Sequence, residues 1–224
     1  MEMINKLIIL LMASFVTLSC SSTPEMETTE DKTLKLLTET LKKQRQKNKL
    51  IDVRTILTRE QIDNANMPVL MVELPSGQNG TLTQYPGTGL GTTWLGIDGA
   101  TLTLQNGVII DSRGMGDDVM GGVTGMPNWK SITEKSYSRS LSYLVKDNVI
   151  LTRNFYCQIL DKQKTETFEF FDVKFVTNLF EETCKDEVGV IENSYFIDKD
   201  NIVRNSYQFH SPSIGYLKIH RVDR

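Results

Sequence analysis

Apolar and polar residues alternate along much of this chain, and turn dipeptides interrupt the alternation at short intervals. From Thr101 to Gln105, leucines alternate with threonine and glutamine, which gives a strand one buried face and one wetter face. Asp98-Gly99 and Asn106-Gly107 flank this run, and both dipeptides favour the positive φ angles of tight hairpin turns. The sequence therefore predicts a three-stranded antiparallel meander over residues 92–113.

The same pattern continues to the C-terminus. Between residues 137 and 145, large side chains share one face and serines occupy the other. Further strands are predicted at 69–74, 149–159, 165–171, 173–183, 188–197, 202–210 and 214–222. Roughly ten strands without a helical interruption are typical of an antiparallel barrel or sandwich. We therefore expect one mainly β domain, an antiparallel β-barrel-like (or sandwich) domain, over residues 67–224.

Helical patterns are confined to the segment before this domain. Thr58-Arg59-Glu60-Gln61 forms a capping box, which predicts a short helix that ends before Met67-Pro68. Leucines at helical spacing among charged residues predict an amphipathic helix over roughly 31–48. Residues 32–66 are therefore expected to form a short N-terminal helical segment.

The first residues have the pattern of an export signal that ends at a lipidation site. Lys6 precedes the apolar run Leu7–Val16, which is too short to span a bilayer because a spanning helix needs about 20 residues. The small residue Ser19 and then Cys20 follow directly. The sequence thus predicts a signal peptide over 1–19, cleavage before Cys20, and a membrane anchor of acyl chains on the Cys20 thiol.

Residues 20–31 are predicted to be a flexible tether, because they contain Ser, Thr, Glu and Pro and hardly any apolar residue. Such a tether reaches on the order of 20 Å from the membrane. Ser21 follows the lipidated cysteine, where an Asp favours retention at the inner membrane. We therefore expect the protein at the periplasmic face of the outer membrane.

Charge gives no indication of a nucleic-acid partner. The formal net charge is −3, and the basic run at 42–47 is expected to cover a solvated helix face. The expected partners are instead the membrane, through the lipid anchor, and polysaccharide-export proteins or the polysaccharide itself.

Lipidation of Cys20 leaves Cys157 and Cys184 in the folded domain. In an oxidising periplasm these two cysteines are a candidate disulfide, and two buried free thiols are the alternative. The histidines, His210 and His220, show no metal-ligand spacing with each other or with the cysteines. No metal and no cofactor is therefore predicted.

Four residues are weak candidates for ligand binding. Asp117 and Asp118, in a glycine-rich stretch, have the chemistry of a cation site or of paired carboxylates acting on a sugar, although Gly with Asp is ordinary loop chemistry. Trp94 and Trp129 have rings that can stack on sugars, although core positions are commoner for aromatic residues in β domains. No catalytic residue is identified, and the protein is not expected to be an enzyme.

Three groups of residues, taken in order, resemble the YjbF/GfcB family of lipoproteins, which is linked to exopolysaccharide and group 4 capsule production. The first is the helix-forming run at 57–63 before Met67-Pro68. The second group is Trp94, Asp98-Gly99, Leu102-Thr103-Leu104, Asn106-Gly107 and Gly114. The third group is Glu182-Thr183-Cys184, Asn193–Asp198 and Ser206-Tyr207-Gln208. The resemblance covers most of the mature chain.

The resemblance implies a β-rich, barrel-like periplasmic domain on an outer-membrane lipid anchor, which takes part in assembly or secretion of an extracellular polysaccharide. It implies no catalytic residues. The chain departs from the family pattern at Tyr195-Phe196, where Tyr-Trp is usual, and at Gly107-Val108, where Gly-Arg is usual. The missing Arg weakens any polar ligand site that depends on it.

Three functions are compatible with these features. The favoured one is a non-enzymatic accessory lipoprotein that binds export proteins or the polymer. The second is a carrier of a lipid or lipid-linked sugar, which requires an open barrel interior. Its expected lining is Tyr137, Leu141, Tyr143, Phe168 and Phe170. The third is a glycan-acting enzyme, which requires the Asp117 and Asp118 carboxylates to face one bond at about 5–9.5 Å.

Overall fold

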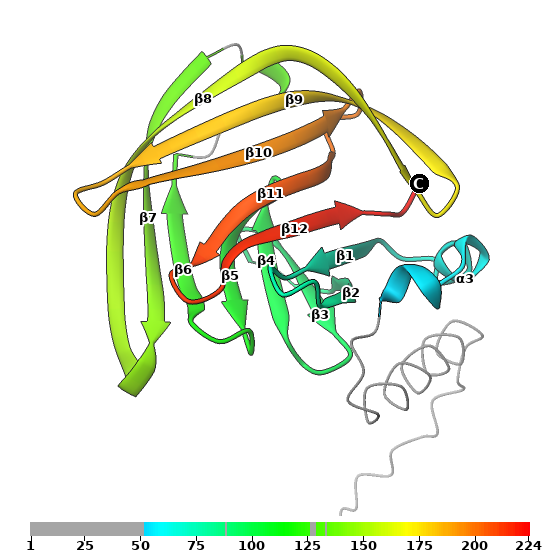
Figure 1. The fold of residues 1–224 in the computed structure, drawn as a ribbon, viewed down its shortest axis with the longest axis horizontal. Coiled ribbons are helices and arrows are strands. Elements are labelled where there is room, and N and C mark those ends of the chain that lie inside the picture. Colours follow the sequence, from blue (N-terminus) through cyan, green and yellow to red (C-terminus); the bar gives the residue numbers. More distant parts are fainter. Residues whose placement is uncertain (1–51, 88, 126–128, 133) are drawn as a thin grey trace, which may run out of the picture.

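The computed structural model describes residues 52–224 except 88, 126–128 and 133 (Figure 1). The predicted signal peptide, the Cys20 lipidation site, the tether and the helix at 31–48 lie outside the described residues. Within the described part, no helix combines the length and apolar character needed to cross a membrane.

A short helical segment precedes the sheet, as predicted. It contains the 3-10 helix η1 (Val53–Thr55) and the helix α3 (Arg59–Asn64). The Gln61 amide donates to the Thr58 hydroxyl at 3.3 Å, and the Thr58 amide donates to the Gln61 side chain at 2.9 Å. This reciprocal pair confirms the capping box and explains why such a short helix forms.

The described residues contain twelve strands in one antiparallel sheet, with the order β5-β4-β3-β2-β1-β12-β11-β10-β9-β8-β7-β6. Hydrogen-bonded pairing of β1 with β12 brings the two ends of the domain together. The two outermost strands, β5 and β6, also lie next to each other, so the sheet curls into a nearly closed barrel (Figure 1). The mainly β, barrel-like fold is therefore confirmed. The strands are β1 (Val69–Glu73), β2 (Asn79–Tyr85), β3 (Thr92–Gly96), β4 (Thr101–Gln105), β5 (Val108–Arg113), β6 (Asp118–Thr124), β7 (Glu134–Val145), β8 (Val149–Phe170), β9 (Val173–Lys185), β10 (Val190–Asp198), β11 (Val203–Ser211) and β12 (Gly215–Arg221).

The predicted meander corresponds to β3, β4 and β5. Gly99, Asn106 and Gly107 have φ angles of 84°, 50° and 83°, as tight turns between adjacent strands require. A side chain on Gly107 would also collide with Val203. The second turn of the meander thus needs glycine for both its backbone angle and its close approach to β11.

Two details of the strand prediction are wrong. The strands expected at 149–159 and 165–171 form one continuous strand, β8, of 22 residues. Its register shifts between Asp161 and Thr165, where Gln163 has a φ of 53° and its amide donates to the Asp161 carboxylate at 2.7 Å. The polar interruption therefore forms a bulge rather than a strand end.

The second error is the omission of β2 and β6. Both strands contain glycine, at Gly80 in β2 and at Gly121 and Gly122 in β6. Glycine weakens a strand pattern in the sequence. These segments nevertheless form strands, because β2 is hydrogen-bonded to β1 and β3 and β6 is hydrogen-bonded to β7.

The apolar side chains form two cores, one inside the barrel and one on its outer surface. β1 contributes to both: Leu70 and Val72 point into the barrel, whereas Val69 and Met71 pack outside against the helical segment. The β8–β9 hairpin arches over the barrel to this side, and Phe170 at its tip packs on the outer core (Figure 1).

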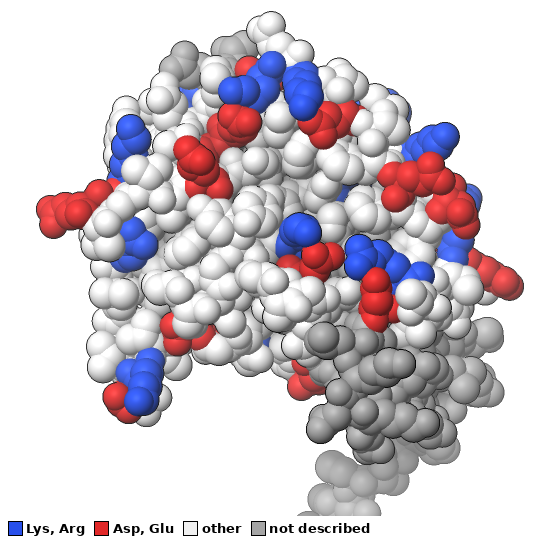
Figure 2. Space-filling model, viewed as in Figure 1, with Lys and Arg blue, Asp and Glu red and all other residues white. Residues whose placement is uncertain are grey.

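The surface carries charges of both signs. Figure 2 shows Lys and Arg interspersed with Asp and Glu over the visible face. Neither sign forms a large continuous patch on that face, so no strong field of one sign extends from it.

Candidate functional site

The barrel interior contains a buried polar network centred on Glu182 of β9, whose side chain is fully buried. Its carboxylate accepts hydrogen bonds from Asn193 Nδ2 at 2.6 Å, from the Tyr195 hydroxyl at 2.8 Å and from the Tyr137 hydroxyl. The Arg139 guanidinium lies 3.5 Å from the same carboxylate. A buried carboxylate is tolerated only when it is paired and hydrogen-bonded, and β7 and β10 provide the partners that Glu182 requires.

The protonation states of this network favour structure over proton transfer. Burial and the Glu182 charge raise the pKa of Tyr195 and of Tyr137 well above the ordinary value, so both hydroxyls keep their protons as donors. Burial acts to lower the pKa of Arg139, but the nearby Glu182 carboxylate opposes this effect and the pKa is raised overall. The network is therefore a charged pair surrounded by neutral donors.

Side chains also fix β5 from across the interior. Arg139 Nη2 donates to the Ile109 carbonyl at 2.8 Å. Gln208 of β11 accepts from the Ile109 amide at 3.0 Å and donates to the Gly107 carbonyl at 2.8 Å. Because β5 is an outermost strand of the sheet, these bonds stabilise it where a neighbouring strand would otherwise do so.

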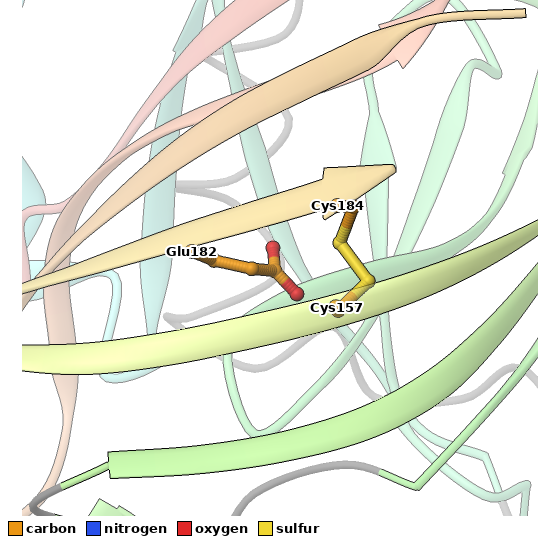
Figure 3. A group of neighbouring side chains, drawn as sticks. All are labelled: Cys157, Glu182 and Cys184. Atoms are coloured by element: carbon orange, nitrogen blue, oxygen red, sulfur yellow. A yellow bond between two sulfur atoms is a disulfide. The ribbon is translucent and has the colours of Figure 1, made fainter. Parts of the chain in front are cut away.

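The disulfide predicted between Cys157 and Cys184 is confirmed, and the alternative of two free thiols is not. The two cysteines are directly opposite each other on β8 and β9, and both are fully buried. Figure 3 shows the Glu182 carboxylate pointing toward this bond, with ligand-type atoms of the three residues within 4.8 Å of one another. Metal binding by cysteine requires thiolates. With the sulfurs bonded to each other, the group is a structural one.

The two histidines are packed in the fold. His210 is fully buried, its Nε2 lies 2.9 Å from the Ser112 hydroxyl, and burial lowers its pKa to about 4. His220 packs against the Phe170 ring with centroids 4.4 Å apart, and burial likewise lowers its pKa to about 4. Both imidazoles are therefore neutral at pH 7 and enclosed.

The predicted acidic pair lies where the β5–β6 turn meets β6, with Asp117 in the turn and Asp118 as the first residue of the strand. The Asp118 carboxylate accepts hydrogen bonds from the Gly114 amide at 2.8 Å and the Met115 amide at 2.9 Å. Asp118 thus closes the turn, with the Ser112 hydroxyl also 3.4 Å from its carboxylate.

The two tryptophans have different environments. Trp129 is buried, donates to the Asn106 carbonyl at 2.7 Å and packs on Tyr195 and Phe180 with ring centroids 5.1 and 5.6 Å away. It closes the barrel interior as a core residue. Trp94 is also buried, but its ring lines a pocket.

This pocket has a volume of about 240 Å³ and lies at one end of the barrel interior, next to the β4–β5 and β10–β11 turns. Side chains from β1, β3, β4, β11 and β12 surround it. The lining residues are Leu70, Thr92, Trp94, Leu104, Asn106, Gly107, Asn201, Ile202, Val203, Ser206, Ile219 and Arg221.

The lining that was expected for a carrier is only partly correct. Tyr137, Leu141 and Tyr143 belong to the buried cluster inside the barrel. Phe168 and Phe170 do not: they stack on each other, and Phe168 contacts Phe196, on the outside of the sheet. They lie outside because the β8–β9 hairpin bends over the barrel instead of continuing its wall. Within the described residues, a large cluster of buried side chains occupies the barrel interior next to the pocket.

The fold, with an apolar core and a buried polar network inside the barrel, defines a class of small antiparallel β-barrel domains. Within that class, residues 32–222 match the profile of the YjbF family, which is described as group 4 capsule polysaccharide lipoprotein GfcB. The chain therefore belongs to the YjbF family of capsule polysaccharide lipoproteins, which confirms the resemblance found in the sequence.

A solved structure has the same fold. The hypothetical lipoprotein YmcC from Escherichia coli K12 is similar to this chain with a TM-score of 0.71 and 13% identity, over 88% of this chain and 96% of that one. Comparison with curated proteins gives no match.

Four of the residues that carried the family resemblance make hydrogen bonds inside the barrel. Glu182, Asn193 and Tyr195 form the buried network, and Gln208 joins the same interior to β5. The sequence prediction missed the role of Arg139. The available signal was its position on the apolar face of β7, because a charged residue there requires a buried partner.

Proposed function

We propose that this protein is anchored through Cys20 at the periplasmic face of the outer membrane and acts there as a non-enzymatic accessory factor in capsule or exopolysaccharide assembly or secretion. The match to the capsule lipoprotein family over residues 32–222 carries this proposal. Cys20, directly after a signal-like apolar run, supplies the anchor.

The chemistry of the interior supports a binding role over a catalytic one. Glu182 is committed to four partners, and His210 is enclosed beside Ser112. Asp118 is bound to backbone amides of its own turn. A general acid or base must reach the proton that it transfers, and these groups are held in structural contacts instead.

The size of the pocket supports an accessory role over a lipid carrier. Sites for drug-sized ligands occupy about 300–1,000 Å³ and bury most of the ligand. At about 240 Å³, the pocket accommodates one small group and not an acyl chain with its head group. The proposed partners are therefore polysaccharide-export proteins or the polymer. Either would bind outside the barrel, or the polymer would place a single sugar residue in the pocket.

Deletion and complementation in the source bacterium test this function. We expect deletion to reduce the extracellular polysaccharide and the wild-type chain to restore it. Cys20→Ala should leave the protein unlipidated, release it from the membrane and fail to complement. Ser21→Asp should keep the lipid but redirect the protein to the inner membrane. Whether this variant complements the deletion shows if function needs the outer-membrane location as well as the anchor. Unchanged polysaccharide in the deletion strain would contradict the proposal.

A further inference from the structure

Apolar and polar side chains together line the pocket at the end of the barrel. Leu70, Leu104 and Ile219 line it beside the Trp94 ring. The Trp94 side chain is 3% exposed, and its indole N–H makes no hydrogen bond to any described residue. A buried donor without a partner is energetically unfavourable, so the Trp94 indole is incompletely satisfied by the described residues.

A cation covers the same aromatic ring. The Arg221 guanidinium carbon lies 5.8 Å from the Trp94 ring centroid, within the range of a cation–π contact. Arg221 Nε donates to the Asp223 carboxylate at 3.1 Å, and this is the only part of the guanidinium with a hydrogen bond among the described residues. The two terminal amino groups are therefore available to a planar anion such as a carboxylate.

Short polar side chains also line the pocket. Asn106 comes from the β4–β5 turn, Asn201 from the β10–β11 turn and Ser206 from β11. The Ser206 hydroxyl accepts from Gln208 Nε2 at 2.8 Å, so its own proton remains free for donation. Arg221 is the one charged residue of the lining, and no lining residue is acidic.

We propose that this pocket binds one sugar residue that carries a carboxylate. This inference rests on the proposed function and names the group of the polymer that the protein contacts. A sugar ring presents C–H groups to apolar and aromatic surface and hydroxyls to amides, which matches the Trp94 face and the asparagines. The carboxylate binds the terminal amino groups of Arg221. The volume restricts the bound part to a single ring, as at a chain end or a side branch.

The two tryptophans of the chain allow a direct test. Full-length lipidated protein in detergent micelles, labelled with 15N at tryptophan, gives two indole N–H signals in NMR spectra, which Trp94→Phe assigns. Methyl glucuronide is the acidic probe and methyl glucoside the neutral one. We expect methyl glucuronide to shift the Trp94 signal saturably at concentrations up to about 10 mM, a weak but measurable affinity. The Trp129 signal should move less than the Trp94 signal, because Trp94 lines the pocket and Trp129 does not; Trp129 reaches it only through its hydrogen bond to the Asn106 backbone carbonyl.

Variants on β12 separate recognition from folding. Arg221→Gln should weaken methyl glucuronide binding by about tenfold or more, the worth of a charge-assisted hydrogen bond. Lys218→Gln is the matched control, because Lys218 lies on the same strand and pairs outside with Glu73 at 2.8 Å. It should bind like the wild type. An unchanged Trp129 signal in each variant shows that the barrel remains folded.

Several outcomes overturn the inference. They are no Trp94 shift with methyl glucuronide, equal shifts with both probes, equal affinity in Arg221→Gln, or equal movement of the Trp129 signal. None of these outcomes depends on, or changes, the result of the deletion experiment. Loss of polysaccharide on deletion combined with no sugar binding therefore rejects the pocket and retains the proposed function, whereas normal polysaccharide on deletion rejects the function itself.

Discussion

Glu182 shows how single residues set the interior of this barrel. Its carboxylate receives donors from Tyr137, Asn193 and Tyr195 and balances the charge of Arg139. Each of these groups would be costly to bury alone, and together they satisfy one another. The network therefore specifies how β7, β9 and β10 face each other, in addition to the apolar packing around it.

Glu182→Ala should destabilise the fold strongly. Removing one member of a buried charged pair costs about 3–5 kcal/mol, because Arg139 is left buried without a counter-charge. Urea unfolding at pH 7 measures the change. Glu181→Ala is the control: this neighbour is 47% exposed and pairs with Lys162, so its loss should have little effect. Equal effects of the two substitutions would contradict a structural role for the network.

At the scale of elements, the long β8–β9 hairpin links the two cores of the domain. One end is fixed inside the barrel by the Cys157–Cys184 disulfide, and the other end places Phe170 on the outer core. The bulge at Asp161–Thr165 lies between these two ends and lets β8 bend, so that one continuous strand contacts both the inner and the outer core.

The double variant Cys157→Ser, Cys184→Ser should lower the free energy of unfolding by about 3–4 kcal/mol, since the bond closes a loop in the unfolded chain. Denaturant unfolding under oxidising conditions measures the loss. With a reductant strong enough to open the bond, wild type and variant should become nearly equal. A difference that persists after full reduction would show that packing of the sulfurs, and not the covalent link, is responsible.

At the scale of the whole molecule, the junction between β5 and β6 determines whether the curled sheet closes into a barrel. The hydrogen-bonded sheet ends at these two strands. Arg139 and Gln208 nevertheless bind the backbone of β5 from the far side of the interior. Side chains thus complete the closure that the backbone ladder leaves open.

Gln208→Met should loosen this junction selectively. The substitution keeps side-chain length but leaves the Ile109 amide and the Gly107 carbonyl without their partner. Hydrogen exchange of the Ile109 amide should accelerate by about tenfold, with smaller changes in β9 and β10. Tyr207→Phe is the matched control on the outer side of β11, where Tyr207 is 43% exposed. Unchanged exchange at Ile109 would show that Gln208 does not hold β5.

Local patterns in the sequence were sufficient for much of this fold. The capping box predicted α3, and the turn dipeptides predicted the meander, because both depend on contacts between residues close in the chain. Alternation assigned the buried face of β7 correctly. The disulfide candidate followed from two cysteines in a chain with a predicted export signal, because an oxidising compartment favours their pairing, and the structure confirms the bond.

The tertiary structure decided what depends on distant partners. β2 and β6 are strands because their neighbours pair with them, and β8 stays continuous because its ladder with β7 and β9 accommodates the bulge. The candidate site also required the fold. Trp94 and Arg221 are far apart in sequence and meet only when β1 pairs with β12. Sequence periodicity records which face of a strand is buried, but it carries no information about which distant side chain lies opposite.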